Sequence, residues 1–414
     1  MTLLMKLAFR NLTRNMRRSM ITLAAIGVGL MVLILGLTLR TGQYEQMINS
    51  GVSQLAGHVV VQHPNFQEEK EPEFLIHNHS QIQQELQQKF PEAHITSRLF
   101  ISGLINSTTS PTFAGITAVD PKSEELVSEF SEKIVKGEWL DDENIKGILI
   151  GKNMAETLNV DLGDKLVFTG QNNGEMNSQL FRVKGIFRVG ATEIDSFVAF
   201  IHYKAAQKFL QQEDVIHQIA VHLPNSKASQ SAKDTTQQML ESQISKHEID
   251  VLLWKEALPD IVNMIKVDQV SNEFINIVLL VIVSMGILNT MLMSVLERFR
   301  EMGVLLAVGM RPQKLAIMVL CEGMILGILG AILGILLGFL ISYPLVTTGL
   351  DMSAQMGESM PVGDTVTSTM IKGKYDWQMM GLYACEAIVL SILSAVYPAL
   401  KILKLHPVEA MRHH

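Results

Sequence analysis

Four long apolar runs constrain the fold of this chain more than any other feature of its sequence. Each is long enough to cross a bilayer, which takes about 20 predominantly apolar residues of helix. The alternative, four buried helices of a soluble protein, is disfavoured by the length of the runs. We therefore predict an integral membrane α-helical protein with four transmembrane helices. The runs are Met20–Leu39, Phe274–Leu296, Leu315–Val346 and Trp377–Leu400.

The basic residues beside these runs predict the orientation of the chain. They gather before the first run, between the second and third, and after the fourth. Because basic loops face the cytoplasm, we expect both termini on that side. The long segment between the first two runs has more acids than bases and is predicted to face outward. The basic residues are Lys6, Arg10, Arg14, Arg17, Arg18, Arg298, Arg300, Arg311, Lys314, Lys401, Lys404 and Arg412.

The outward segment is predicted to be a large extracytoplasmic mixed α/β domain between helices 1 and 2. Short apolar stretches predict strands, and longer amphipathic stretches predict helices. The expected strands are His58–Gln62, Ile148–Ile150, Lys165–Thr169, Gln179–Val189 and Ile216–His222. The expected helices are Ser80–Phe90, Ser123–Lys133, Lys152–Leu158, Lys204–Gln211 and Ala228–Ser245. Helical spacing over Trp254–Val270 predicts a stalk helix that continues into the second span, with Pro259 in its first turn.

No catalytic or metal-binding pattern stands out in the sequence. Gly151 and Lys152 suggest a phosphate-binding loop, but the spacing is wrong and Asn153 replaces the required Ser or Thr. The histidines lack metalloprotease spacing, and a solvated loop is the favoured interpretation of His77 and His79. Two cysteines, both in apolar runs, cannot form a disulfide framework. We expect no catalytic residue, no metal and no nucleic-acid partner.

Three segments at the ends of the spans resemble MacB/FtsX-type ABC transporter permeases. They are LAFRNLTRNMRRSMITLAAIGVG at the N-terminus, ERFREMGVLLAVGMRPQKLAIMVLCEG at 297–323 and YPALKILKLHPVEAMR at 397–412. Within that family the chain is most similar to the lipoprotein-releasing (Lol-type) branch. That likeness lies in GQYEQMINSGVSQLAGHVVVQHPNF and IGKNMAETLNVDLGDKL.

The resemblance implies an assembly in the bacterial inner membrane. Two permease protomers, as a homo- or heterodimer, would stand over two copies of a separate ABC ATPase. That subunit would hold ATP and Mg²⁺, so no cofactor is expected in this chain. The resemblance also implies mechanotransmission, in which ATPase motion is relayed to the outer domain. The substrate would be a lipid, lipoprotein or other amphiphile, with a periplasmic protein as a further partner.

These expectations divide the chain into nine segments. They are an amphipathic cytoplasmic helix (1–19), span 1 (20–41), the extracytoplasmic domain (42–253), the stalk with span 2 (254–296), a cytoplasmic coupling segment (297–314), span 3 (315–346), an outer loop (347–376), span 4 (377–400) and a cytoplasmic tail (401–414).

The segment between spans 2 and 3 is predicted to dock onto the ATPase. It begins with charges and continues as a short apolar helix, and such amphipathic helices dock into grooves. The alternative is an interfacial helix that lies on the lipid head groups. The candidate coupling residues are Glu297, Arg298, Arg300, Glu301, Met302, Gly303 and Arg311.

Glycines and two acids mark spans 3 and 4. Small residues four apart let helices approach closely, within the protomer or across a dimer. The glycines are Gly323, Gly327, Gly330, Gly334 and Gly338. Acids inside a membrane suggest function. For Glu322 we favour a structural hydrogen-bonding role, and for Glu386 a substrate-facing role and a packed polar contact stay equally open.

One segment departs from the Lol-type pattern. Permeases of that branch that recruit a carrier protein use a long proline-containing hairpin, whereas FTGQNNGEMNSQLF (168–181) predicts a short Gly/Asn turn. Two other functions therefore stay open. One is an FtsX-like permease that transports nothing and activates a periplasmic hydrolase, and the other is a MacB-like efflux permease.

Overall fold

The structure is a computed structural model that describes residues 2–14, 16–69, 71–172, 174–353, 359–362 and 365–403. The chain forms two compact units. The first combines residues 1–44, 266–350 and 371–414, and the second combines residues 45–265 and 351–370. The predicted tail beyond residue 403 lies outside the described residues.

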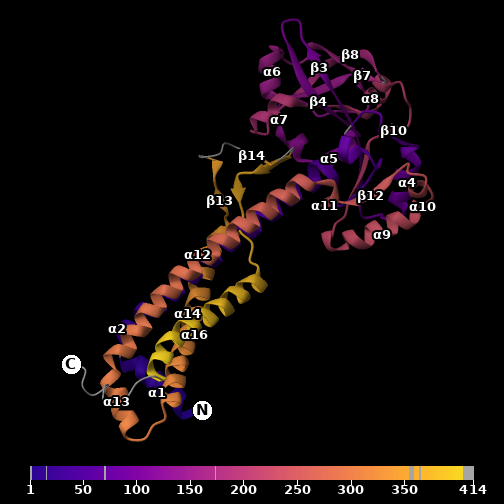
Figure 1. The fold of residues 1–414 in the computed structure, drawn as a ribbon. Helices are drawn as coiled ribbons and strands as arrows, with labels where there is room; N and C mark the ends of the chain where they lie inside the picture. The colour runs from indigo at the N-terminus through magenta and orange to yellow at the C-terminus, as the bar shows by residue number, and fades with distance from the viewer. Residues whose placement is uncertain are drawn as a thin grey trace. The chain divides into compact units, whose positions relative to one another are not determined.

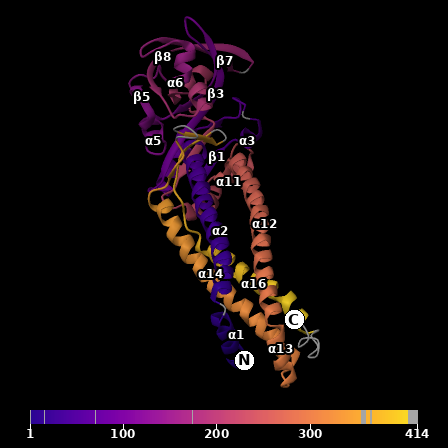
Figure 2. The same cartoon turned by 90° about the vertical axis from the view of Figure 1, so that its left-hand side faces the viewer.

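Four long helices dominate the first unit, and each is long and apolar enough to cross a membrane (Figures 1 and 2). In lipid, a helix is favoured because it satisfies every backbone hydrogen bond internally. At about 1.5 Å per residue, the longest of them extends roughly 58 Å. They are α2 (Met16–Gly51), α12 (Pro259–Glu297), α14 (Pro312–Thr347) and α16 (Trp377–Leu403). Two shorter helices, α1 (Thr2–Arg14) and α13 (Phe299–Ala307), belong to the same unit.

Aromatic rings gather where α14 ends and α16 begins. Tyr375 stacks on Phe339 with ring centroids 5.1 Å apart, and Trp377 lies 5.3 Å from Tyr375. Trp377 is 64% exposed. Aromatic residues with one apolar side and one polar atom prefer the membrane–water interface, so this cluster marks the outer end of the spans.

The second unit is built on a ten-stranded sheet of order β12-β1-β11-β3-β4-β9-β6-β8-β5, with β7 paired to β3 and β8. The first strand of the chain, β1, therefore lies between β11 and β12, the last two strands of this sheet in sequence. The strands are β1 (Val59–Gln62), β3 (His94–Asn106), β4 (Pro111–Val119), β5 (Ile134–Gly137), β6 (Gly147–Gly151), β7 (Lys165–Asn172), β8 (Glu175–Phe187), β9 (Val198–His202), β11 (Gln218–His222) and β12 (Asp250–Leu253).

Three two-stranded ladders and several short helices surround this sheet. The ladders are β2 (Ile76–His77) with β10 (Val215–Ile216), β13 (Leu350–Asp351) with β16 (Met370–Ile371), and β14 (Ser359–Val362) with β15 (Thr365–Ser368). The helices are α3 (Phe66–Glu69), α4 (His79–Lys89), α5 (Pro121–Glu125), α6 (Lys152–Leu158), α7 (Thr192–Phe197), α8 (Tyr203–Leu210), α9 (Ser229–Met239), α10 (Glu241–Ser245) and α11 (Trp254–Ala257). Single turns are η1 (Val52–Ala56), η2 (Glu129–Lys133) and η3 (Ser226–Ala228).

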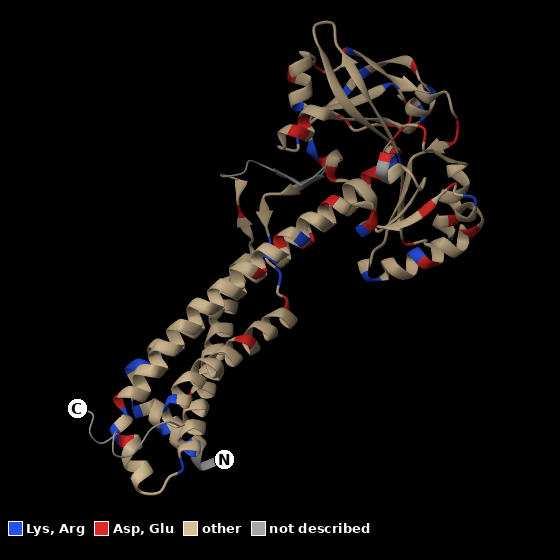
Figure 3. Ribbon diagram, in the orientation of Figure 1, with Lys and Arg blue, Asp and Glu red and all other residues tan. Residues whose placement is uncertain are grey.

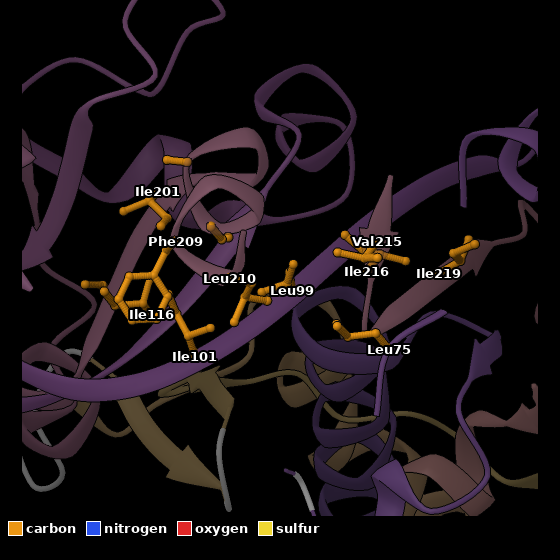
Figure 4. Packing of buried hydrophobic residues seen from close by; sticks show 14 of the residues in the cluster. Leu75, Leu99, Ile101, Ile116, Ile201, Phe209, Leu210, Val215, Ile216 and Ile219 are labelled. Carbon is orange, nitrogen blue, oxygen red and sulfur yellow. The ribbon is translucent and has the colours of Figure 1, made fainter. Parts of the chain in front are cut away.

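Aliphatic and aromatic side chains from the sheet and its helices form two cores in this unit, and Figure 4 shows part of the larger one. Leu99 of β3 and Ile201 of β9 are fully buried, and Phe209 of α8 packs with them. Alternate residues of a strand point to opposite faces, so each central strand contributes to the larger core with one face.

A buried ion pair anchors the start of the second unit. Arg98 on β3 donates from Nη2 to Glu124 Oε1 on α5 at 2.8 Å, and both side chains are almost fully buried. The same nitrogen donates to the carbonyl oxygen of Ser53 at 2.8 Å. Ser53 lies in η1, a π-helical turn directly after α2. The pair therefore fixes the end of that helix to the sheet.

Several sequence-based expectations need correction. The stalk helix is not continuous from Trp254, because α11 ends at Ala257 and α12 starts at Pro259. A residue before proline avoids helical angles, and Leu258 has φ −121° and ψ 60°. The expected helix Ser123–Lys133 is instead α5 and η2. Ser128 interrupts it, since its side chain accepts a hydrogen bond from the Phe130 N–H and starts a new turn.

Two long strands were not expected from the sequence, namely β3 and β4. The short turn expected within 168–181 is the tip of a hairpin between β7 and β8, and Gly174 there has a φ of 81°.

The ends of the spans also differ from those predicted. The helix α2 continues to Gly51, past the predicted end at residue 41.

Candidate functional site

The candidate coupling segment forms a helix–turn between α12 and α14. The chain leaves α12 at Glu297, bends at Arg298 and forms α13. It then reverses at Gly309, whose φ of 100° favours glycine. Pro312 opens α14 at a position where the missing N–H costs nothing. Charged residues gather at this end of the first unit, and the middle of the four long helices is largely free of them (Figure 3).

The predicted coupling residues divide into an inner and an outer group. Met302 is 1% exposed and Gly303 is buried, so both face the core of the first unit. Arg300 and Arg311 are exposed and make no ion pair among the described residues. Because Gly303 is buried, a larger side chain there would displace the core.

Glu322 lies at the centre of a buried polar contact. Its Oε1 accepts a hydrogen bond from Asn11 Nδ2 at 2.7 Å and another from Arg298 Nη1 at 3.1 Å. Glu322 is 3% exposed and Arg298 is 8% exposed. One carboxylate thus joins α1, the start of the coupling segment and α14.

A second ion pair ties α13 to α1 at the surface. Arg14 Nη2 donates to both carboxylate oxygens of Glu301 at 2.5 Å. The hydrogen bond and positive charge of Arg14 hold the pKa of Glu301 below its usual value, and the carboxylate raises the pKa of Arg14. Arg298 also reaches Glu301 at 3.4 Å. A third pair joins Arg18 to Glu297.

The partners on the N-terminal helices were not among the predicted site residues. Asn11, Arg14 and Arg18 follow one another at spacings of three and four residues, which predicts one common helix face. That spacing was a usable signal. It did not identify the acidic partners of these residues, because the partners are far away in sequence: Asn11 and Glu322 are 311 positions apart in the chain.

The glycines of α14 face two different neighbours. A Cβ atom added at Gly323 or Gly327 would lie 2.8–2.9 Å from Ala395 or Ser391 of α16. Added at Gly330, Gly334 or Gly338, it would lie 2.6–2.8 Å from α2. Such distances leave no space for a side chain. The glycine ladder therefore lies at contacts within the protomer.

Glu386 lies apart from these contacts. It occupies α16 and is half-exposed, and within the described part of the chain it makes no hydrogen bond or ion pair. The nearby Tyr383 accepts a hydrogen bond from Asn276 of α12 at 2.8 Å, so α12 and α16 touch one turn away from Glu386.

Comparison with known proteins gives two family models that together cover most of the chain. One, described as FtsX-like permease C-terminal, matches residues 273–407. The other, described as MacB-like periplasmic core domain, matches residues 19–239, which is more than half of the chain.

Individual relatives are similar at low identity over nearly their whole length. The lipoprotein-releasing system transmembrane protein LolE of Haemophilus influenzae is 22% identical over 404 residues, covering 94% of each chain. The uncharacterized ABC transporter permease YvrN of Bacillus subtilis is 23% identical over 431 residues, covering 99% of this chain and 98% of that one. The periplasmic region of MacB from Actinobacillus actinomycetemcomitans aligns at 14% identity with a TM-score of 0.37, covering 50% of this chain and 92% of that one.

Proposed function

Because this chain belongs to the MacB/FtsX-type family of ABC transporter permeases, we propose that it couples ATP hydrolysis by a separate ATPase to release of a membrane-anchored substrate. The substrate is a lipoprotein or another amphiphile in the outer leaflet of the inner membrane. The lipoprotein-releasing name of its relatives supports this class of substrate.

The observation that carries the proposal is the exposed side of the coupling segment. Val304 is 49% exposed and Val308 is 81% exposed. They lie one helical turn apart, beside the exposed cations Arg300 and Arg311. Exposed apolar side chains with a polar rim are typical of docking surfaces, and a short amphipathic helix fits a hydrophobic groove. We assign this surface to the ATPase.

The opposite side of the coupling segment explains how a displacement of α13 by the ATPase is transmitted to the other helices. Met302 is buried in the core, and Arg298 and Glu301 are bound to α14 and α1. Movement of α13 therefore moves these helices and the end of α12 with it. Because α12 is one helix from Pro259 to Glu297, displacement at its last residue reaches its first.

The tight turn of the β7–β8 hairpin favours a second function. The hairpin has no proline and turns at Gly174, whereas the Lol-type pattern for carrier recruitment has a proline-containing hairpin. An FtsX-like permease that activates a periplasmic hydrolase needs no such carrier. Mass spectrometry of proteins and lipids that copurify with the chain discriminates: a lipid-anchored cargo supports release, and a hydrolase without cargo supports activation.

The docking surface is tested with Val304→Asp and Val308→Asp in the complex with the ATPase. Each places a charge on the proposed contact, and we expect at least tenfold weaker ATPase association with normal membrane insertion. Met176→Asp, at a residue 67% exposed on β8, is the matched control. Wild-type association of both variants would refute the docking surface. Robust ATP hydrolysis by the chain alone would refute the assignment of hydrolysis to a separate ATPase.

A further inference from the structure

The N-terminal helix α1 carries positive charge and no negative charge. Its sequence, TLLMKLAFRNLTR, contains basic residues and no acid. Lys6, Arg10 and Arg14 follow one another at intervals of four residues and lie along one side of the helix, where like charges destabilise it. Arg14 has a carboxylate partner in Glu301. Lys6 and Arg10 are exposed and make no ion pair in the part of the chain that the structure describes. Two of the three cations therefore lack an anion within the described residues.

Exposed apolar side chains lie beside these cations. Phe9 is 55% exposed, and Met5, one turn before it, is 40% exposed. Phe9 and Lys6 are three residues apart and are therefore neighbours on the surface of the helix. The other side of α1 packs on its own unit, where Ala8 is fully buried. The outer surface of α1 thus combines an apolar strip with a basic one.

The position of α1 places this surface at a membrane. The first span, α2, begins at Met16, and both Met16 and Met20 expose their side chains. Ser19 of α2 donates a hydrogen bond to the carbonyl oxygen of Leu12 at 2.9 Å, which holds α1 against the start of the span. Lysines and arginines gather at this end of the first unit (Figure 3), and we assign this end to the cytoplasm. The outer surface of α1 then lies at the lipid head groups of the cytoplasmic leaflet.

The inner side of α1 connects this surface to the coupling segment. Asn11 donates a hydrogen bond to Glu322 of α14 at 2.7 Å. Arg14 donates to Glu301 of α13 at 2.5 Å. Glu301 lies three residues before Val304, which belongs to the surface that we assign to the ATPase. A fixed position of α1 therefore fixes the position in which α13 presents that surface.

Anionic phospholipid has the chemistry that the outer surface of α1 requires. Phosphate oxygens can bind the cations that no carboxylate binds, and acyl chains can cover Met5 and Phe9. Basic amphipathic helices bind membranes through these two contributions. We propose that α1 binds the phosphate groups of anionic phospholipids through Lys6 and Arg10, and that this binding holds the coupling segment in its docking position. The second part rests on the proposed function, whereas the first part does not.

The lipid site is tested in the full chain without the ATPase. In a background in which Cys321 and Cys385 are replaced by serine, Phe9→Cys is labelled with bimane in vesicles of phosphatidylcholine and phosphatidylglycerol. Each surface cation strengthens attraction to an anionic leaflet about fivefold. We therefore expect nitroxide-labelled phosphatidylglycerol to quench the bimane severalfold more strongly than phosphatidylcholine with the same label.

The same measurement on charge variants identifies the groups that hold the lipid. Lys6→Gln with Arg10→Gln should abolish the preference for phosphatidylglycerol. The matched control is Lys227→Gln with Lys246→Gln, which removes two exposed cations from the other unit. The control should keep the preference.

The link to the coupling segment is tested by ATP turnover of the complex with the ATPase. Turnover is measured in phosphatidylcholine vesicles with an increasing fraction of phosphatidylglycerol. We expect a severalfold rise for the unmodified chain and for the control. Lys6→Gln with Arg10→Gln should lose this rise but should bind the ATPase normally in detergent.

Equal quenching by the two lipids would overturn the lipid site and leave the proposed function intact. Turnover of the unmodified complex that ignores phosphatidylglycerol would overturn the link to the coupling segment. If Lys6→Gln with Arg10→Gln fails to bind the ATPase in detergent, the two cations contact the ATPase and the proposal is also overturned. Absence of ATPase stimulation in every lipid mixture would contradict the proposed function instead, while the quenching still decides the lipid site.

Discussion

Arg298 at the end of the second span donates a hydrogen bond to Glu322 inside the third, with Nη1 and Oε1 3.1 Å apart. Both side chains are buried, so water cannot replace either residue as the hydrogen-bond partner of the other. Removing one member of such a pair costs about 3–5 kcal/mol, whereas replacing both with apolar residues is often neutral.

We expect Glu322→Leu to destabilise the protein strongly, because the buried Arg298 would keep only its longer contact with the exposed Glu301. The double variant Arg298→Met with Glu322→Leu should recover most of the loss. Thermal unfolding of the purified protein in detergent measures both. A tolerated single variant would show that Arg298 reaches water or lipid head groups instead.

The Arg14–Glu301 pair gives a different prediction because it is exposed, and exposed pairs contribute about 0–1 kcal/mol. We expect Glu301→Lys to leave thermal stability nearly unchanged but to repel Arg14 and Arg298 and displace α13. ATPase stimulation should fall. The charge swap Arg14→Glu with Glu301→Arg should restore it. No rescue by the swap would mean that Glu301 contacts the ATPase directly.

Gly334 allows a direct test of close helix packing. A Cβ there would lie 2.7 Å from the Cβ of Leu30 and 3.0 Å from the carbonyl oxygen of Gly27. Gly334→Val should cost about 1–3 kcal/mol through overpacking. Gly381→Ala is the matched control, since nothing lies within 4 Å of its added Cβ. Equal unfolding temperatures for the two variants would contradict the packing described here.

The extracytoplasmic domain should lose stability in acid through His217. This side chain is fully buried and stacks on Phe66 at 4.7 Å. Its Nδ1 accepts from the Phe100 N–H at 2.9 Å. Burial lowers its pKa from 6.5 to about 4, so the unfolded chain binds the proton first as the pH falls. Stability is complete above about pH 6.5 and declines toward pH 4, by about 2 kcal/mol at pH 5.

His217→Gln should reduce the difference in unfolding temperature between pH 7.5 and pH 5 by about 4–8 °C. Scanning calorimetry of the purified protein measures it. The exposed His77→Gln should keep the wild-type pH dependence. An unchanged pH dependence in His217→Gln would place the acid sensitivity elsewhere.

Membrane topology is testable with single cysteines on a background without Cys321 and Cys385. Asn172→Cys should react with an impermeant thiol reagent in intact spheroplasts. Lys314→Cys should react only after permeabilisation. Labelling of Lys314→Cys in intact spheroplasts would reverse the predicted orientation.

The sequence predicted the elements whose signal is local. A span is a contiguous apolar run, so four runs identify four helices. The Gly/Asn turn before β8 was also predicted from its residues. The strands β3 and β4 were missed, partly because Thr96 and Arg98 interrupt the apolar pattern of β3. Those polar residues are buried only because Glu124, 26 positions beyond Arg98, accepts their hydrogen bonds.

The candidate site was predictable to a similar extent. Charge and position pointed to the candidate coupling segment, but they did not separate the buried Met302 from the exposed Val304. That distinction depends on which side of α13 packs on the rest of its unit. The partners Arg14 and Glu301 are 287 positions apart, and their pairing follows from tertiary packing that no local pattern encodes.

The position of β1 has a consequence for synthesis of the chain. Val59–Gln62 pairs with β11 on one side and β12 on the other, and β12 ends at Leu253, six residues before α12 begins. A strand made early therefore waits for nearly the whole domain to be translocated before its backbone is paired. Unpaired strand edges are prone to wrong pairing. The sheet of the outer domain can therefore be completed only after β12 has been made, when six residues separate the chain from the start of the second span.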